Sequence, residues 1–255
     1  MLMLFGLLSR LKLSKKPISL EVTARMQHYF PIVGAAIGLI VAFVAYLLFY
    51  FIGGSISPLL IAAMVVLLLY FLTGIIHLEG LADFGDGLMT SGDIARKRSA
   101  MKDVSLGAAG TFFLAFDLLL MVFLIGELSS STISLGIFQW DPSIFFVGGI
   151  IVAEISGKLA MTTVMTLGPS SHEGMGSIFV KAASRSKYAV ALILSLLLAF
   201  ASSGWLFPIV LCGVIAGLVV TFIARKHFGG VSGDSFGAAN ELGRILALFI
   251  WVIVI

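Results

Sequence analysis

Apolar stretches of membrane-spanning length recur along most of this chain of 255 residues. A helix needs around 20 predominantly apolar residues to cross about 30 Å of hydrocarbon. Hydrophobic residues make up 60% of the sequence and charged residues only 11%, which is too apolar a composition for a soluble domain of this length. The sequence therefore predicts an all-α, polytopic integral membrane protein, a helical bundle that forms a single domain over residues 1–255.

About seven transmembrane helices can be placed on the apolar stretches. They run over residues 31–52, 58–76, 106–128, 144–164, 188–203, 205–223 and 245–255. The fifth and seventh are short for a full crossing, which leaves open that they are tilted, partial or extended backwards into polar sequence.

The positions of lysine and arginine predict which side of the membrane each loop faces, because cytoplasmic loops collect them. Outside the seven stretches they occur at Arg10, Lys12, Lys15, Lys16, Arg25, Arg96, Lys97, Arg98, Lys102, Lys181, Arg185, Lys187, Arg225, Lys226 and Arg244. All of these lie on one side of the membrane if the N-terminus is cytoplasmic. We therefore attribute the net charge of +3 to membrane orientation, and expect no nucleic-acid partner.

Two further features bear on the membrane. Residues 1–20 are expected to form an interfacial helix on the cytoplasmic surface, since their positive charges follow the apolar run, whereas a secretory signal carries them before it. Within the spans, Glu154 and Lys158 are four residues apart and are expected to pair along one helix. Asp117 is left without an explanation.

Three carboxylates follow the second predicted span directly. If this stretch is helical, Glu79, Asp83 and Asp86 share one face. Like charges at this spacing repel by about 3 kcal/mol per adjacent pair at an effective dielectric near 20. The face should therefore take up protons or hold a cation, and oxygen ligands favour a hard divalent ion such as Mg²⁺.

Basic residues follow the acidic ones in the same predicted cytoplasmic loop, residues 77–105. Carboxylates that hold a cation, beside Lys and Arg that hold anionic oxygens, are what a phosphoryl-transfer site requires. The run Arg96-Lys97-Arg98 fits this role and fits contact with anionic lipid equally well. His77, next to the acids, is a better candidate for a general base than His172, which is expected to be a surface histidine.

A glycine-rich segment near the C-terminus forms a third predicted cytoplasmic loop, over residues 225–244; the second covers residues 166–187. Glycines let a backbone approach a ligand closely and point its N–H groups inward. Asp234 is predicted to be the N-cap of the helix that follows, and Glu241 lies seven residues on, on the same face.

These motifs resemble those of a known family. The stretch from Thr73 to Gly87 resembles the histidine-led acidic signature of the cobalamin synthases, or adenosylcobinamide-GDP ribazoletransferases. Residues 101–110 resemble the second acidic block of that family, and residues 229–241 resemble its C-terminal glycine-rich block. Together the matches cover most of the chain.

The resemblance implies an enzyme of late cobalamin biosynthesis. It would transfer the phosphocobinamide moiety of adenosylcobinamide-GDP to α-ribazole or α-ribazole 5′-phosphate, release GMP and form adenosylcobalamin or its 5′-phosphate, with Mg²⁺ as cofactor. The implied partners are the corrinoid nucleotide, α-ribazole and the lipid bilayer; a homo-oligomer or an association with other cobalamin-assembly enzymes is left open. We expect a multi-pass protein of the cell membrane whose active site faces the cytoplasm.

The resemblance also implies roles for individual residues. Glu79, Asp83 and Asp86 would hold Mg²⁺, with Asp103 or Asp234 completing the site. The residues expected in catalysis are His77, Lys102 and Asp103, of which Lys102 would neutralise phosphate. Those expected to bind the substrate nucleotide are Gly229, Gly230, Gly233, Asp234, Gly237 and Glu241.

Two other functions compete with this one. A membrane phosphotransferase that uses a CDP-activated lipid also places an Asp-x-x-Asp-Gly run at a helix end, which residues 83–87 satisfy, but the rest of that motif is missing at the expected spacing. A secondary transporter would line an ion path with Asp117, Glu154 and Lys158. The concentration of acids at one face and the lack of a recognisable inverted repeat disfavour it.

Overall fold

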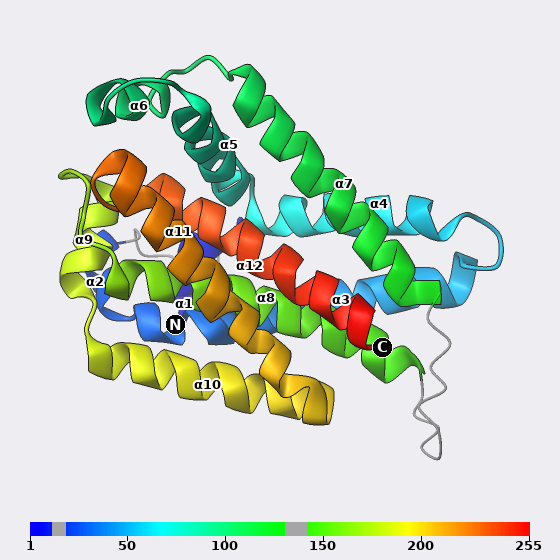
Figure 1. The fold of residues 1–255 in the computed structure, drawn as a ribbon. Coiled ribbons are helices and arrows are strands. Elements are labelled where there is room, and N and C mark those ends of the chain that lie inside the picture. The colour runs from blue at the N-terminus through cyan, green and yellow to red at the C-terminus, as the bar shows by residue number, and fades with distance from the viewer. Residues whose placement is uncertain (12–18, 131–141) are drawn as a thin grey trace.

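The computed structural model describes residues 1–11, 19–130 and 142–255, and these residues form helices joined by short turns (Figure 1). The long helices are α3 (Phe30–Ile52), α4 (Pro58–Thr73), α7 (Ala108–Ser130), α8 (Pro142–Leu167), α10 (Arg185–Ser203), α11 (Cys212–Phe228) and α12 (Gly233–Val254). The shorter elements are α1 (Leu2–Leu8), α2 (Leu20–Arg25), α5 (Ile76–Met89), α6 (Ile94–Ala100), α9 (Met175–Ala182) and the 3₁₀ segments η1 (Gln27–Tyr29) and η2 (Gly204–Leu211). The predicted all-α class is confirmed.

Five stretches of the described chain are long and apolar enough to cross a membrane. They are Gln27–Ile52, Ala108–Leu128, Phe145–Leu167, Arg185–Phe228 and Gly233–Val254, and α4 together with α5 makes a sixth if the bent pair counts as one span. The predicted count of seven is not confirmed, because two of the predicted spans fall within Arg185–Phe228. The last predicted span extends backwards, since α12 begins at Gly233 rather than at residue 245.

A sharp bend separates α4 from α5. The two helices meet at 97°, and Gly74, at the end of α4, has a φ of +74°, which a residue with a side chain rarely adopts. The second predicted span therefore ends at Thr73, and α5 runs nearly perpendicular to α4. In Figure 1, α5, α6 and α9 gather at one end of the bundle.

The three predicted cytoplasmic loops are largely helical, in agreement with the helices expected over residues 79–86 and after Asp234. The first contains α5 and α6, the second contains α9, and α12 begins inside the third. Short polar side chains in these regions are helix caps: Asp93 accepts the backbone N–H of Arg96 at 2.9 Å, and Ser184 and Ser232 cap α10 and α12. Such residues interrupt an apolar pattern without ending the helical region.

Helix α8 lies at the centre of the bundle and is almost entirely buried. Glycines on its neighbours let their backbones come close: a Cβ added at Gly38 of α3 would lie 2.8 Å from the Cα of Ile151 in α8. A Cβ added at Gly157 of α8 would lie 2.7 Å from the carbonyl oxygen of Asn240 in α12. Small residues at such crossings are characteristic of helix packing in membranes. They fix α12, which carries part of the site described below.

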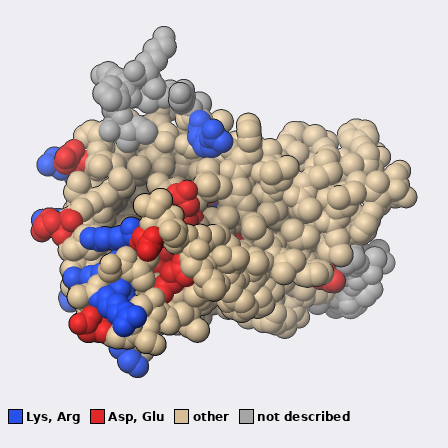
Figure 2. Space-filling view, turned by 90° about the horizontal axis from the view of Figure 1, so that it is seen from above, with Lys and Arg blue, Asp and Glu red and all other residues tan. Residues whose placement is uncertain are grey.

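Charged side chains gather at one end of the molecule. Figure 2 shows Lys, Arg, Asp and Glu concentrated around a hollow at the end formed by α5, α6 and α9, while most of the remaining visible surface lacks them. Of the segment predicted to be interfacial, α1 covers Leu2–Leu8, with Leu4 and Leu8 buried and Leu2 exposed. Residues 12–18, also within that prediction, lie outside the described residues.

Candidate active site

The acidic face of α5 has the predicted helical register. Glu79 is exposed, and Asp83 and Asp86 are partly buried. Another face of α5 carries Gly80, at which an added Cβ would lie 3.1 Å from the Cα of Asp234. The glycine allows α5 to cross the start of α12 closely, and this crossing brings a fourth carboxylate beside the three on α5.

Asp234 joins this acidic group through its place at the start of α12. The helix begins at Gly233 and its N-cap is Ser232, whose side chain accepts the backbone N–H of Ser235. The prediction that Asp234 is the cap is therefore wrong, and its carboxylate is free to face elsewhere. It accepts a hydrogen bond from the Ser232 hydroxyl at 3.1 Å.

The proximity of the four acids has an electrostatic consequence for Asp83, on α5 and outside the five spanning stretches. Burial, together with the carboxylates of Asp234, Glu79 and Asp86, raises the pKa of Asp83 to about 6. In the described part of the chain, no hydrogen bond or ion pair is made by the side chain of Asp83 or Glu79. This is the repulsion expected of a face that binds protons or a cation.

Asp86 has a different role from its neighbours. Its two carboxylate oxygens accept the backbone N–H groups of Gly107 and Gly110, both at 2.8 Å. These groups lie at the N-terminal end of α7, which begins at Ala108, where unpaired N–H groups favour a negative charge. Asp86 therefore attaches α5 to α7.

The predicted Mg²⁺ ligands do not form a compact metal-binding group. Among the residues that the structure describes, no three Asp, Glu, His or Cys side chains are arranged so that they could hold a metal ion. Glu79 and Asp83, whose side chains have no hydrogen-bond or ion-pair partner among the described residues, and the nearby Asp234 nevertheless supply hard oxygen donors, which is the donor chemistry that Mg²⁺ prefers.

The second predicted loop is held against the glycine-rich segment by backbone hydrogen bonds. Ser171 N–H donates to the carbonyl of Val231 at 2.9 Å, and Val231 N–H donates to the carbonyl of Pro169 at 2.7 Å. Gly230 lies so close that an added Cβ would be 2.7 Å from the Ser171 nitrogen. This pairing keeps His172, exposed as predicted, near Asp234.

Two cavities meet at this point. One, of about 180 Å³, is lined by Arg98 and Lys102 among others. The other, of about 340 Å³, is lined mainly by apolar side chains and includes His77 and Gly233. The residues shared by both linings are His172, Ser232 and Asp234. The structure thus brings predicted residues from four segments around one junction.

Other predicted residues lie away from the junction. Asp103 is exposed, lines neither cavity and accepts the N–H of Ser105 at 2.9 Å. Gly229 has a left-handed φ of +69° and ends α11. Gly237 packs on α5, where an added Cβ would be 2.7 Å from the carbonyl oxygen of His77.

The basic run stabilises the end of a helix. Arg98 donates from Nε and Nη2 to the carbonyl of Phe228, at 2.8 and 2.6 Å, and Lys97 Nζ lies 2.8 Å from Nδ1 of His227. Both contacts are at the C-terminal end of α11, where unpaired carbonyls favour cations. Sequence interpretation considered phosphate and lipid for this run and missed the helix end.

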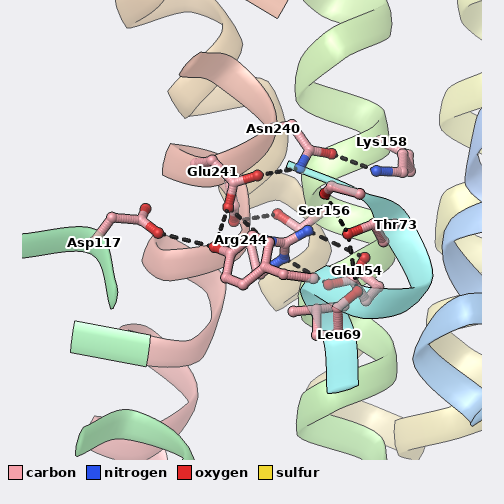
Figure 3. A network of polar contacts seen from close by, with 12 residues as sticks. Leu69, Thr73, Asp117, Glu154, Ser156, Lys158, Asn240, Glu241 and Arg244 are labelled. Atoms are coloured by element: carbon pink, nitrogen blue, oxygen red, sulfur yellow. Dashed lines mark hydrogen bonds and ion pairs between the residues drawn. The ribbon is translucent and has the colours of Figure 1, made fainter. Parts of the chain in front are cut away.

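Glu241 belongs to a buried polar network rather than to the cavities (Figure 3). Arg244 forms an ion pair with Glu241 and another with Glu154, whose Oε1 lies 2.5 Å from its Nε. Lys158 Nζ donates to Asn240 Oδ1 at 2.6 Å. The predicted pairing of Glu154 with Lys158 is therefore wrong, because α12 supplies each with a partner that sequence spacing does not reveal.

The network also accounts for Asp117. The Tyr70 hydroxyl lies 3.0 Å from Asp117 Oδ2 and 2.9 Å from Glu241 Oε2. A hydroxyl has one proton to donate, so both contacts are hydrogen bonds only if one of the two carboxyl groups carries a proton. Asp117 thus links α7 to the network between α4 and α12.

Comparisons with known proteins agree along the chain. A family model described as cobalamin-5-phosphate synthase matches residues 1–252. A relative from Methanococcoides burtonii, named adenosylcobinamide-GDP ribazoletransferase, is 30% identical over 252 residues, or 98% of this chain and 90% of its own. A relative of the same name from Methanosarcina barkeri is 29% identical over 98% of this chain and 90% of its own length. Another from Methanocella arvoryzae is 38% identical over 69% of this chain and 68% of its own length. No solved structure matches the chain.

Proposed function

Because this chain belongs to the cobalamin-5-phosphate synthase family, we propose that it transfers the phosphocobinamide moiety of adenosylcobinamide-GDP to α-ribazole or α-ribazole 5′-phosphate and releases GMP. The predicted family is confirmed, and the reaction is the one that the relatives are named for. Neither a CDP-lipid phosphotransferase nor a transporter accounts for a family match over residues 1–252.

The observation that supports this proposal best is the junction of the two cavities at Asp234. One cavity is lined by Lys102 and Arg98, whose charges suit the oxygens of a diphosphate. The other is large enough for part of a nucleoside. Phosphoryl transfer depends mainly on positioning and charge neutralisation, and the junction offers both.

In the proposed reaction, a ribose hydroxyl of the acceptor attacks the phosphorus atom that is bonded to cobinamide. The 5′ hydroxyl is blocked in α-ribazole 5′-phosphate, so the hydroxyl that both candidate acceptors have free is at another position of the ribose. A new P–O bond forms, the bond to the bridging oxygen breaks, and GMP leaves with the electron pair. His77, which lines the larger cavity, is the proposed acceptor of the hydroxyl proton.

We propose that carboxylates of Glu79, Asp83 and Asp234 would hold Mg²⁺ together with the diphosphate of the substrate. The described side chains alone form no group of three metal ligands, and Mg²⁺ is commonly bound by one or two carboxylates plus substrate phosphates. The ion would neutralise charge on the diphosphate as the GMP group leaves. Asp86 is less suited to the inner ligand set, because both its oxygens accept N–H groups from α7. Lys102 would hold phosphate oxygens by charge, as predicted from the family resemblance.

The proposed location is the cell membrane, with the N-terminus and the charged end in the cytoplasm. The described chain has several helices long and apolar enough to cross a bilayer. The orientation is supported by the positions of Lys and Arg in the sequence and by the gathering of charges at one end (Figure 2). A water-soluble nucleotide substrate would reach the junction from that side.

The test is to incubate the purified protein in detergent with adenosylcobinamide-GDP, α-ribazole and Mg²⁺. We expect equal amounts of GMP and a complete corrinoid, and no reaction after the metal is removed with a chelator. Transfer from a CDP-activated lipid, with no product from adenosylcobinamide-GDP, would contradict the proposal. Product formation that is unchanged by the chelator would contradict the role of Mg²⁺ alone.

A further inference from the structure

The larger cavity has a mostly apolar wall whose ligand the proposed transfer does not identify. Its volume is about 340 Å³, within the range of small-molecule sites. Met161 and Met165 of α8 form part of its wall, with Phe179 of α9 and Phe236 of α12. These side chains are buried and belong to the hydrophobic core. The cavity therefore offers flexible thioethers and aromatic rings to a flat apolar group.

Polar groups in the lining of this cavity are few. They are His77, His172, Ser232 and Asp234, and the last three also line the smaller cavity beside Lys102 and Arg98. A ligand can therefore place an apolar part in the larger cavity and an anionic part in the smaller one. The group that joins these two parts would lie near Asp234.

We propose that the larger cavity binds the aromatic base of the acceptor nucleoside. This inference rests on the proposed function, which brings three ring systems to the protein: the corrin, the guanine and the dimethylbenzimidazole of α-ribazole. The corrin is a macrocycle with amide side chains, which is too large and too polar for about 340 Å³ of mainly apolar space. The choice is between the two bases.

Guanine has an amide, an amino group and a ring N–H along its edges, and each of these needs a hydrogen-bond partner when it is buried. Three methionine and three phenylalanine side chains in the lining provide none, and three of the four polar lining residues are shared with the smaller cavity, at the junction, rather than with the apolar wall. Dimethylbenzimidazole has one unsubstituted ring nitrogen and two methyl groups when it is joined to ribose. One polar group is enough to satisfy that nitrogen, and the apolar wall suits the rest.

This assignment also orients the acceptor. With its base against Met161 and Met165, the ribose of the nucleoside points toward the shared lining residues and presents its hydroxyls at the junction. The donor diphosphate would then approach from the side of Lys102. The two substrates thus meet at Asp234 from opposite cavities, as an in-line attack requires.

The experiment compares two methionine truncations. Met165→Ala enlarges the cavity, whereas Met121→Ala removes the same atoms from α7 at a buried position outside both cavity linings. Binding of α-ribazole and of adenosylcobinamide-GDP to each purified protein is measured by titration calorimetry. For Met165→Ala we expect α-ribazole to bind about 10-fold more weakly, with the affinity for adenosylcobinamide-GDP unchanged. A riboside whose base has one more fused ring should regain affinity for this variant.

Every outcome separates the alternatives. Equal losses for both truncations, or unchanged α-ribazole binding by Met165→Ala in a protein that still forms product, would overturn the base-binding assignment and leave the proposed function standing. Weaker binding of GMP and adenosylcobinamide-GDP by Met165→Ala alone would assign the cavity to guanine instead. A wild-type protein that binds no α-ribazole and forms no product would overturn both proposals.

Discussion

Acidic side chains in this molecule occur in two different environments, one in which they form ion pairs and one in which they do not. In the interior, Glu154 and Glu241 are both paired with Arg244, and all three are buried. At the charged end, Asp83 and Glu79 make no ion pair with any described residue. The first group satisfies its charges within the protein, whereas the second leaves them available.

Physical chemistry explains why both arrangements persist. A charge inside the bundle costs several kcal/mol unless it is paired and hydrogen-bonded, so the interior acids require Arg244. At the end of the bundle, solvent reduces that cost, and unpaired acids can be kept for a ligand at some expense in repulsion. The contrast is consistent with an interior network that maintains the structure and with the proposed role of the acids at the charged end in the chemistry.

The largest effect on stability is expected from Arg244→Met. The substitution removes the ion-pair partner of Glu154 and Glu241, both buried, which costs about 3–5 kcal/mol. Thermal unfolding in detergent should show a large fall in melting temperature, and adding Glu154→Gln to the same protein should recover part of it. A melting temperature within the error of wild type would show that the network does not stabilise the bundle.

The largest effect on activity at the charged end, after Asp83, is expected from Asp234→Asn. Loss of one charge at the junction should lower turnover about 100-fold or more, since electrostatic groups of this kind contribute that much. The melting temperature should equal or exceed that of the wild type, because the repulsion with Asp83 is removed and the amide oxygen can still accept the hydrogen bond from the Ser232 hydroxyl. GMP release and thermal unfolding are measured on the same sample; wild-type turnover would exclude Asp234 from the site.

Asp86→Ala tests a residue that lies on the acidic face at the charged end but, like the interior acids, has its carboxylate held by partners. Removing the acceptor of two N–H groups at the start of α7 should cost about 1–2 kcal/mol. Gly110→Ala is the matched control, because its new Cβ would lie 2.5 Å from Asp86 Oδ2 and should displace the same carboxylate. If Asp86→Asn abolishes turnover at wild-type stability, Asp86 is a metal ligand as first predicted rather than an attachment of α7.

The smallest effect is expected from Glu173→Gln. Glu173 forms an ion pair with Lys181 at 2.7 Å, but the two side chains are 79% and 64% exposed. Exposed pairs contribute about 0–1 kcal/mol, so melting temperature and GMP release should both stay near wild type. A shift comparable to that of Arg244→Met would break the distinction between buried and exposed pairs.

Local rules predicted the features that depend on neighbours in sequence. The register of Glu79, Asp83 and Asp86 follows from helical geometry alone, and α5 confirms it. The family was identified from this stretch together with residues 101–110 and 229–241, and it is confirmed over residues 1–252. Apolar composition was enough to predict an all-α membrane protein.

Contacts between distant segments explain the errors. The pairing rule for residues four apart selected Lys158 for Glu154, but Arg244, 90 residues away, is the partner. Gly237 was expected to bind the substrate nucleotide, whereas it packs against Gly80 and His77 of α5. Asp234 was predicted to be the N-cap of the last helix, but the N-cap of α12 is Ser232. Sequence spacing carries no information about which helices cross.

The central claim is that the unpaired acids at the charged end serve the reaction and not the fold, and Asp83→Asn tests it most directly. GMP release from adenosylcobinamide-GDP with α-ribazole and Mg²⁺ is measured alongside thermal unfolding of the same preparation. The account predicts a loss of turnover of about 100-fold or more with no fall in melting temperature. Turnover equal to wild type, or a loss explained by unfolding, would contradict it.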